Sequence, residues 1–270
     1  MTGPVPTTPS RGKRGVCLDD KVEFLSQSAA YPRPPARVET VETHMSWVFL
    51  TDTRAYKLKK PIRFRELDYR SLGARHRSCQ REVELNRRLA PDIYLGVVPL
   101  VRTAGGGFRL NGKGRVVDWL VEMLRLPEEC TLEHRLSIGP VAEDRIRHLA
   151  RVLVRFFREA APATGLTVEG ILNRLHGDIL ESRKELADND VGGATNAVNR
   201  VTTQLLEFLA SRASLFRTRL ESGRYVEGHG DLRPEHVYLD ARTEGEVIIT
   251  DCLEFDRRLR LLDPADELAF

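Results

Sequence analysis

Two acidic residues near the end of the chain have the setting that phosphoryl transfer requires. Asp231 lies in the Pro-containing segment His229–Val237, and Asp251 follows an apolar, β-branched run at 247–250. One carboxylate can orient a substrate hydroxyl while the other binds a magnesium ion, because this chemistry consists mainly of positioning and charge stabilisation. The context and spacing therefore predict a catalytic pair. The alternative is a turn that carries ordinary aspartates.

The composition limits the class of protein. The 270 residues are 41% hydrophobic and 30% charged, with a formal net charge of +3. This balance gives no global bias towards nucleic acid, and no apolar run is long enough to predict a membrane span. The four cysteines stand apart without a metal-binding or small-domain pattern, which favours reduced thiols and a cytoplasmic protein.

The first part of the chain is predicted to be β-rich after a disordered tail at 1–16. A short helix is expected at 18–30, followed by strands near 38–43, 46–51 and 54–58. Alternation along the third strand places Lys57 and Lys59 on one face, opposite Tyr56 and Leu58. A lysine side chain on this face can point into a cleft.

A helix is expected at 71–90, with Glu82 on a face that can meet the preceding strand. A Lys57–Glu82 ion pair is the functional interpretation, and solvated surface charges are the alternative. Strands at 94–103 and 116–126 follow, joined by a glycine-rich stretch. Gly107–Lys113 matches the start of a phosphate-binding P-loop, but Gly114 stands where Ser or Thr is needed, so a long hairpin is favoured.

The remainder is predicted to be mainly helical. Apolar residues recur at helical spacing over 141–160, 168–186 and 201–220, with a loop at 188–194. His176–Asp178 repeats the triplet that opens the segment around Asp231, but it lies within a helical pattern and is interpreted as coincidence. Glu254, which follows Asp251, could add a metal or substrate contact, but charged residues after a strand are usually solvated, and Glu254 is expected to be so.

Several segments together resemble a known superfamily. They are Thr43–Leu50, Tyr56–Pro61, Glu82–Pro91, His229–Val237 and Asp251–Phe255. They resemble the protein-kinase-like superfamily, in particular its aminoglycoside phosphotransferase and choline kinase branch and a bacterial aminoglycoside-phosphotransferase-like family of undefined substrate. The resemblance implies an α+β, bilobal protein-kinase-like fold. An antiparallel β-sheet N-lobe would span 17–124, and a mainly helical C-lobe, expected to be truncated, would span 125–270.

The resemblance also implies roles for individual residues. Asp231 would be the catalytic aspartate and Asp251 the magnesium ligand, while Arg233 would neutralise charge on the transferred phosphoryl group. Lys57 would contact the ATP phosphates with Glu82 holding it, and Lys59 is the alternative for that lysine.

Three further features concern the nucleotide. Glu122 and Leu124 would belong to the hinge that binds adenine, and Thr43 and Ser46 stand where related proteins carry a glycine-rich loop. His236 replaces the asparagine that binds a second metal, and a neutral imidazole is a poorer magnesium ligand than a carboxylate or amide oxygen. One or two metals are therefore both compatible with the sequence.

The leading hypothesis is an ATP- and Mg²⁺-dependent kinase that phosphorylates a hydroxyl of a sugar, an aminoglycoside-like compound or an amino alcohol. The first alternative is a nucleotide-binding pseudokinase or regulatory module without turnover. A metal-dependent hydrolase built on His229, Asp231, His236 and Asp251 is the second. We expect neither a nucleic-acid nor a membrane partner, and the sequence does not define the acceptor or the oligomeric state.

Overall fold

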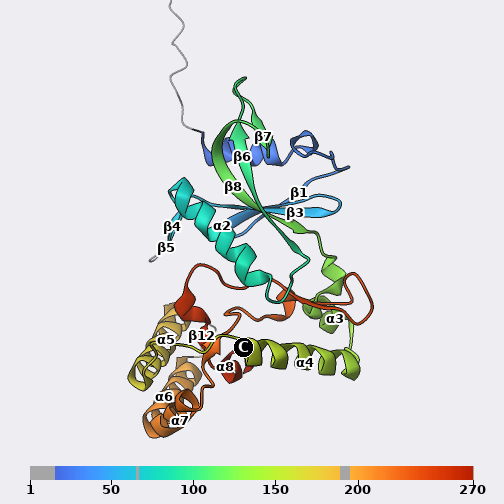
Figure 1. The fold of residues 1–270 in the computed structure, drawn as a ribbon. Helices are drawn as coiled ribbons and strands as arrows, with labels where there is room; N and C mark the ends of the chain where they lie inside the picture. The colour runs from blue at the N-terminus through green and yellow to red at the C-terminus, as the bar shows by residue number, and fades with distance from the viewer. Residues whose placement is uncertain (1–15, 65–66, 189–194, 270) are drawn as a thin grey trace, which may run out of the picture. The chain divides into compact units, whose positions relative to one another are not determined.

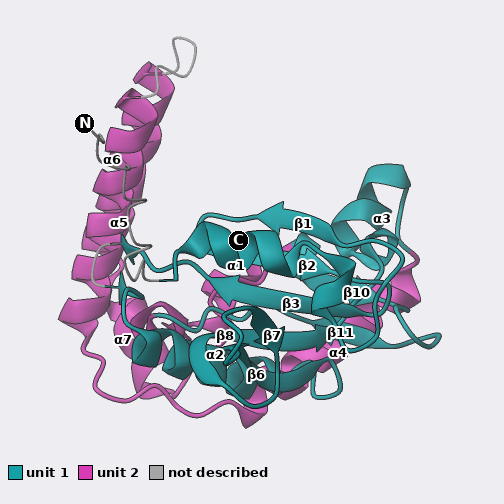
Figure 2. Cartoon of the chain, turned by 90° about the horizontal axis from the view of Figure 1, so that it is seen from above, with its two compact units in different colours: residues 1–141, 234–255 teal, residues 142–233, 256–270 magenta. Residues whose placement is uncertain are grey.

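The computed structural model describes residues 16–64, 67–188 and 195–269 (Figure 1). The chain forms two compact units, each built from two segments of sequence (Figure 2). Unit 1 combines residues up to Val141 with Pro234–Phe255, and unit 2 combines Ala142–Arg233 with the residues from Asp256 onwards. The expected tail at 1–16 lies outside the described residues except for its last position.

Unit 1 is built on a six-stranded antiparallel sheet with the strand order β1-β2-β3-β8-β6-β7. The strands are β1 (Glu39–Glu42), β2 (Ser46–Leu50), β3 (Arg54–Lys59), β6 (Tyr94–Arg102), β7 (Phe108–Leu110) and β8 (Arg115–Leu124). All six are antiparallel to their neighbours, and β8 pairs with both β3 and β6. The antiparallel, β-rich character predicted for this part of the chain is confirmed, and so are the strands near 38–43, 46–51 and 54–58.

One face of this sheet packs against the N-terminal helix. Helix α1 (Leu18–Leu25) is capped by Cys17, whose sulfur accepts a hydrogen bond from the amide of Asp20, and it ends before a 3-10 turn, η1 (Ser28–Ala30). The buried residues of this core are Leu25, Ala30, Tyr31, Phe49, Tyr56, Leu58, Leu100, Leu110 and Leu120. Since Tyr56 and Leu58 belong to it, strand alternation turns Lys57 and Lys59 towards the other face.

The other face is covered by α2 (Leu72–Asn86), which lies across the sheet in Figure 1. The hydroxyl of Ser71 caps this helix by accepting from the amide of Ala74 at 3.1 Å. The buried residues of the second core are Cys79, Val83, Ala90, Ile93, Tyr94, Val121 and Ile248. Ile248 belongs to the hairpin of β10 (Val237–Leu239) and β11 (Val247–Ile249), so residues late in the sequence complete this core.

The glycine-rich stretch forms a hairpin. Strands β6 and β7 pair across it, with Leu100 opposite Leu110, and β8 follows directly. The hairpin predicted for this stretch is therefore confirmed, and the P-loop alternative is wrong because no helix follows Lys113. The close approach of the backbone explains the glycine at position 114, because a Cβ there would lie 2.6 Å from the carbonyl oxygen of Arg102.

Smaller elements complete unit 1. They are β4 (Arg63–Phe64), β5 (Leu67–Asp68), η2 (Glu128–Cys130), α3 (Leu132–Ile138) and η3 (Pro234–His236). No pattern in the sequence predicted α3, which is only two turns long. It begins where the hydroxyl of Thr131 accepts from the amide of His134 at 3.1 Å.

Unit 2 is mainly helical. Its helices are α4 (Glu143–Glu159), α5 (Val168–Asp188), α6 (Thr195–Ser211), α7 (Ala213–Glu221) and α8 (Pro264–Ala269). Strands β9 (Val226–Glu227) and β12 (Leu261–Leu262) pair beside a 3-10 turn, η4 (Arg257–Arg260). Helices α5 and α6 pack side by side (Figure 2).

Two helices of unit 2 correspond to the expected ones and the third differs. Helices α4 and α5 confirm the expected helices at 141–160 and 168–186, and His176–Asp178 lies inside α5 as predicted. The single helix expected at 201–220 is wrong, because Arg212 at φ −115° and ψ 22° separates α6 from α7. Most of the expected loop at 188–194 lies outside the described residues. In the described ranges, every helix is too short or too polar to cross a lipid bilayer.

Candidate active site

A buried cluster of charges in unit 1 begins with the two lysines of β3. The Lys57 side chain is 15% exposed and the Lys59 side chain is 2% exposed. Lysine is rarely buried without a charged partner, because moving an ammonium group out of water is costly. Both lysines must therefore be paired within this face of the sheet.

Glu82 of α2 pairs with both of them. Its Oε1 lies 3.1 Å from Nζ of Lys57, and its Oε2 lies 2.6 Å from Nζ of Lys59. The Glu82 side chain is fully buried. The structure thus contains the predicted Lys57–Glu82 contact and also places the alternative lysine on the same carboxylate.

Asp251 contributes the exposed carboxylate of the cluster. Its Oδ1 lies 2.6 Å from Nζ of Lys57, and its side chain is 44% exposed. The backbone of Asp251 has φ +62°, in the left-handed region that non-glycine residues seldom adopt. Such a conformation persists only where the surroundings impose it, which is common at functional sites.

The backbone around Asp251 is held by unit 1 itself. The Asp251 amide donates to the hydroxyl of Tyr94 at 3.1 Å, and the Cys252 amide donates to Oδ1 of Asn86 at 2.8 Å. The side-chain amide of Asn86 in turn donates to the carbonyl of Glu82 at 2.9 Å. One turn of α2 therefore fixes both the carboxylate that pairs with Lys57 and the backbone that carries Asp251.

Glu254 is a further member of the cluster, although the sequence favoured a solvated side chain at this position. Its Oε1 lies 2.5 Å from Nζ of Lys59, and its side chain is 10% exposed. The same oxygen accepts from the hydroxyls of Tyr69 at 3.1 Å and Ser78 at 3.2 Å. The expectation that Glu254 is solvated is wrong, because Lys59 and two hydroxyl groups compensate for its burial. The sequence signal for Glu254 was its position three residues after Asp251.

The charges in this cluster support one another. Burial by itself favours the neutral form of each group, but the neighbouring charges outweigh it. The pKa of Lys57 is held well above its usual value because Asp251 and Glu82 face it, and that of Lys59 is raised by Glu254 and Glu82. Burial likewise opposes ionisation of Asp251 and Glu254, yet Lys57 lowers the pKa of Asp251 and Lys59 lowers that of Glu254. Three carboxyl groups therefore face two ammonium groups in this cluster.

The donor set around Asp251 is small. Nε2 of His236 lies 3.7 Å from Oδ2 of Asp251, and His236 is buried. Across the described ranges, no group of three or more His, Cys, Asp or Glu side chains is arranged to hold a metal ion. Magnesium commonly uses one or two carboxylates and completes its shell with water and substrate phosphates. The single exposed carboxylate of Asp251 fits that mode of binding, and the imidazole of His236 is a poor addition to it.

Thr43 and Ser46 form the turn between β1 and β2. The hydroxyl of Thr43 accepts from the amide of Ser46 and donates to its carbonyl, both at 3.0 Å. Ser46 is cross-strand partner to Lys59, so the two side chains share a face of the sheet. The Ser46 hydroxyl is buried and has no hydrogen-bond partner within the described ranges. An unpaired buried hydroxyl costs about 1–3 kcal/mol.

Glu122 and Leu124 lie at the end of β8. The Glu122 carboxylate accepts from the hydroxyl of Tyr56 at 3.1 Å. The Leu124 amide donates to the carbonyl of Ile93 at 2.9 Å, so this amide already has a partner inside unit 1. The predicted adenine contact of Leu124 would have to use another of its atoms.

Asp231 and Arg233 belong to unit 2. Nε of Arg233 lies 3.0 Å from Oδ1 of Asp231, and the Asp231 amide donates to Nδ1 of His229 at 3.3 Å. His229 is buried, and its own amide donates to Oε2 of Glu267 at 3.0 Å. The other oxygen of Glu267 accepts from the amide of Gly230. Glu267 of α8 and the ring of His229 therefore brace the loop that carries Asp231.

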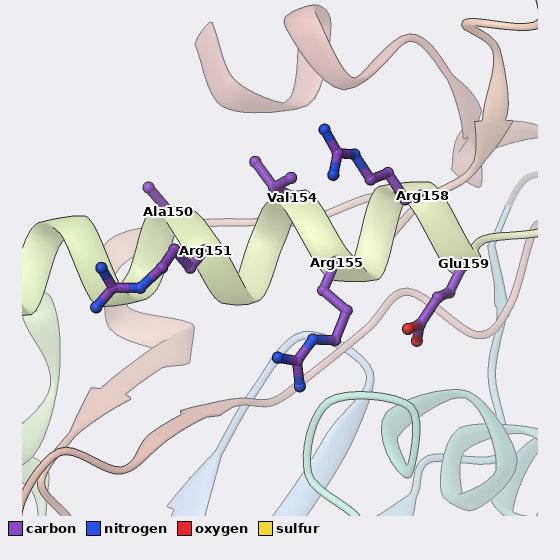
Figure 3. Close-up of a pocket in the computed structure, with 6 residues that line it drawn as sticks. All are labelled: Ala150, Arg151, Val154, Arg155, Arg158 and Glu159. Atoms are coloured by element: carbon purple, nitrogen blue, oxygen red, sulfur yellow. The ribbon is translucent and has the colours of Figure 1, made fainter.

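Unit 2 also has a basic surface on α4. A hollow of about 550 Å³ is lined by Ala150, Arg151, Val154, Arg155, Arg158 and Glu159, which lie along this helix in Figure 3. All six side chains are exposed. The hollow contains none of the predicted site residues.

Comparison with known proteins gives relatives without a defined activity. Uncharacterized proteins of Mycobacterium bovis (strain ATCC BAA-935 / AF2122/97) and Mycobacterium tuberculosis (strain ATCC 25618 / H37Rv) are each 33% identical to the chain over 237 residues. The alignments cover 86% of this chain and 45% of each relative. The chain therefore spans about half the length of the curated relatives it matches. No family model matches the chain.

Proposed function

We propose that the chain is an ATP-dependent phosphotransferase that moves the γ-phosphoryl group to a hydroxyl of a small molecule. The observation that carries the proposal is the arrangement of Lys57, Glu82 and Asp251 in unit 1. Lys57 bridges a buried carboxylate on α2 and an exposed carboxylate that has an unusual backbone conformation. A lysine held in this way can bind nucleotide phosphates, and an adjacent exposed aspartate can bind their magnesium ion.

The architecture of unit 1 supports the same proposal. An antiparallel sheet with a helix between its third strand and the next long strand is the arrangement that the resemblance to the protein-kinase-like superfamily implies. In this proposal unit 1 binds the nucleotide, and the mainly helical unit 2 contributes to the acceptor site. Fold-level similarity does not define the acceptor, so sugars, aminoglycoside-like compounds and amino alcohols all belong in the screen.

Each residue has a distinct task in this scheme. Lys57 binds the α- and β-phosphates, and Glu82 keeps the ammonium group in place. Asp251 is the residue that would hold Mg²⁺, which when bound neutralises charge on the phosphates. Asp231 orients the acceptor hydroxyl and receives its proton, and Arg233 stabilises charge on the transferred group. The need for ATP and the free cysteines favour a cytoplasmic protein.

The first experiment is calorimetric titration of ATP, with and without Mg²⁺, into the full chain and into Asp251→Asn. We expect the wild type to bind Mg-ATP and the variant to lose most of the gain that Mg²⁺ provides. Asp92→Asn is the matched control, because Asp92 is exposed in the same unit and pairs only loosely with Arg242, at 3.5 Å. Failure of the wild type to bind Mg-ATP would refute the proposal.

The second experiment separates a kinase from a nucleotide-binding module. Phosphoryl transfer is measured with a panel of hydroxyl acceptors on the wild type and on Asp231→Asn. Because general acid–base groups contribute about 10²–10⁴-fold to rates, we expect turnover to fall by that factor while Mg-ATP affinity stays the same. Binding without turnover on any acceptor would favour the pseudokinase alternative. Bound zinc without ATP binding would favour the hydrolase alternative.

A further inference from the structure

We propose that Lys59 and Glu254 form a positioning pair that sets the Mg²⁺ affinity of the nucleotide site by fixing Asp251. This inference rests on the proposed function and assigns a task to two residues that do not themselves contact the nucleotide. It is based on a difference between the ion pairs of the two lysines of β3. Both pair with Glu82, but each has a different second carboxylate.

The exposure of the two lysines shows which one can reach a ligand. Lys57 is partly exposed and pairs with Asp251, whose side chain is 44% exposed. Lys59 is 2% exposed, and its ammonium group lies between Glu82 at 2.6 Å and Glu254 at 2.5 Å. Both partners of Lys59 are buried, whereas Asp251, one of the two partners of Lys57, is accessible to a ligand. We therefore assign the phosphate to Lys57 and an internal role to Lys59.

Glu254 is attached to the wall of the site at several points. One of its oxygens contacts Lys59 on β3, the hydroxyl of Tyr69, and Ser78 on α2. Ser78 also donates to Tyr69 at 2.7 Å, which links these partners to one another. The side chain of Glu254 is therefore held by a strand, by a helix and by the segment that joins them.

The position of Glu254 in the sequence makes this attachment act on Asp251. Only two residues separate them, and the Cys252 amide between them is bound to Asn86. Asp251 itself has the uncommon left-handed backbone conformation, which the surroundings must maintain. Glu254 anchors the C-terminal end of this short segment, as Tyr94 and Asn86 anchor its start. Groups that orient a metal ligand typically change metal affinity by about 10–100-fold when they are removed.

The test compares Glu254→Gln with the wild type by calorimetry, using ATP with Mg²⁺ and ATP in a chelator. The glutamine keeps the size of the side chain and can accept from Tyr69 and Ser78, but it loses the charge that pairs with Lys59. We expect the gain in ATP affinity from Mg²⁺ to fall by at least about tenfold. The affinity for ATP in the chelator should not fall, because Lys57 keeps its place on Glu82.

A matched control and a second variant guard against a folding defect. Glu246→Gln removes an equal charge from the same unit, where Glu246 pairs with Arg242 at 2.9 Å, and should leave both affinities unchanged. The double variant Lys59→Met with Glu254→Gln removes both buried charges together, which is far less destabilising than leaving one of them unpaired. It should be folded and should still show the weakened Mg²⁺ dependence.

The outcomes separate the inference from the function on which it rests. A wild type that binds no ATP overturns both. A wild type that binds Mg-ATP, with variants that keep the full gain from Mg²⁺, overturns the positioning role alone. A parallel loss of both affinities in the folded variants also overturns it, because a merely structural defect weakens binding with and without metal equally.

Discussion

Lys57 and Asp251 are 194 positions apart in the sequence, and Nζ of the lysine lies 2.6 Å from Oδ1 of the aspartate. The contact joins β3 to the segment that follows β11. Unit 1 thereby brings a cation and an exposed carboxylate together beside the buried Glu82. A nucleotide with its metal ion needs both kinds of group within a short distance.

The first prediction concerns Lys57. Replacing it by Met in Lys57→Met removes a charged hydrogen-bond donor for phosphate, and such bonds contribute about 1.5–3 kcal/mol. We expect the dissociation constant for ATP to rise by roughly 10–150-fold. Calorimetry would measure this, with Lys113→Met as the control because Lys113 lies exposed near the β6–β7 hairpin. Equal affinities for Lys57→Met and the wild type would exclude Lys57 as the phosphate lysine.

The second prediction concerns the stability contributed by Lys59. Lys59→Met leaves Glu254 buried without its ammonium partner, and breaking a buried ion pair in this way costs about 3–5 kcal/mol. Arg147→Met is the control for an exposed pair, because the side chains of Arg147 and its partner Glu143 are 70% and 78% exposed. Exposed pairs contribute about 0–1 kcal/mol, so this variant should unfold close to the wild type. Chemical denaturation of both variants would test the difference, and similar midpoints would contradict it.

The third prediction concerns Gly228, next to the buried His229. A Cβ at this position would lie 2.5 Å from Oε2 of Glu267 and 2.9 Å from Cδ1 of Leu262. Gly228→Ala must therefore displace the carboxylate that binds the amides of His229 and Gly230, and overpacking of this kind costs about 1–3 kcal/mol.

Replacing Gly177, in the same unit, by alanine is expected to stabilise the protein. Gly177 lies in α5, and a Cβ there meets no atom within 4 Å. Since alanine is favoured over glycine within helices by roughly 0.5–1 kcal/mol, Gly177→Ala should raise the melting temperature while Gly228→Ala lowers it. A Gly228→Ala protein as stable as the wild type would show that Glu267 does not hold this loop as described.

The fourth prediction concerns pH. The pKa values of Asp251 and Glu254 are lowered in the folded protein, so their charged forms stabilise it above their unfolded values of about 4, and this contribution is lost as the pH falls below that. The pKa values of Lys57 and Lys59 are raised, so their contribution is complete below about pH 10 and is lost above it.

The measurement is the melting temperature as a function of pH. The wild type should lose stability in acid below about pH 4, and the double variant Lys59→Met with Glu254→Gln should lose less over that range. Circular dichroism at a series of pH values would record both curves. An identical loss of melting temperature in acid for both proteins would contradict the role assigned to the Lys59–Glu254 ion pair.

Local patterns predicted the longer strands of unit 1 and helices α1 and α2, because strand alternation and helix caps act over a few residues. Alternation along β3 was sufficient to separate Lys57 from Tyr56 and Leu58. The burial of Glu254 was not predictable in this way, since it depends on Lys59, Tyr69 and Ser78, which are distant in sequence. No local pattern indicates that Asn86 binds the amide of Cys252.

Departures in unit 2 have a similar cause. The apolar spacing of 201–220 runs through Arg212 without a glycine or proline to mark an end, although the backbone leaves the helical conformation there. The bracing of Gly230 by Glu267 likewise joins residues 37 positions apart. The roles of Asp231, Arg233 and Asp251 in catalysis remain predictions, which the experiments above address.

The two-segment construction of unit 1 has a consequence for synthesis on the ribosome. Its sheet is complete once Leu124 has been made, but Ile248, which belongs to the core against α2, is translated only after all of Ala142–Arg233. Until then, the α2 face of the nascent sheet lacks part of its apolar cover, and Lys57 and Lys59 lack Asp251 and Glu254. Emergence of Pro234–Phe255 from the exit tunnel would therefore complete this core and supply the carboxylate partners of both lysines.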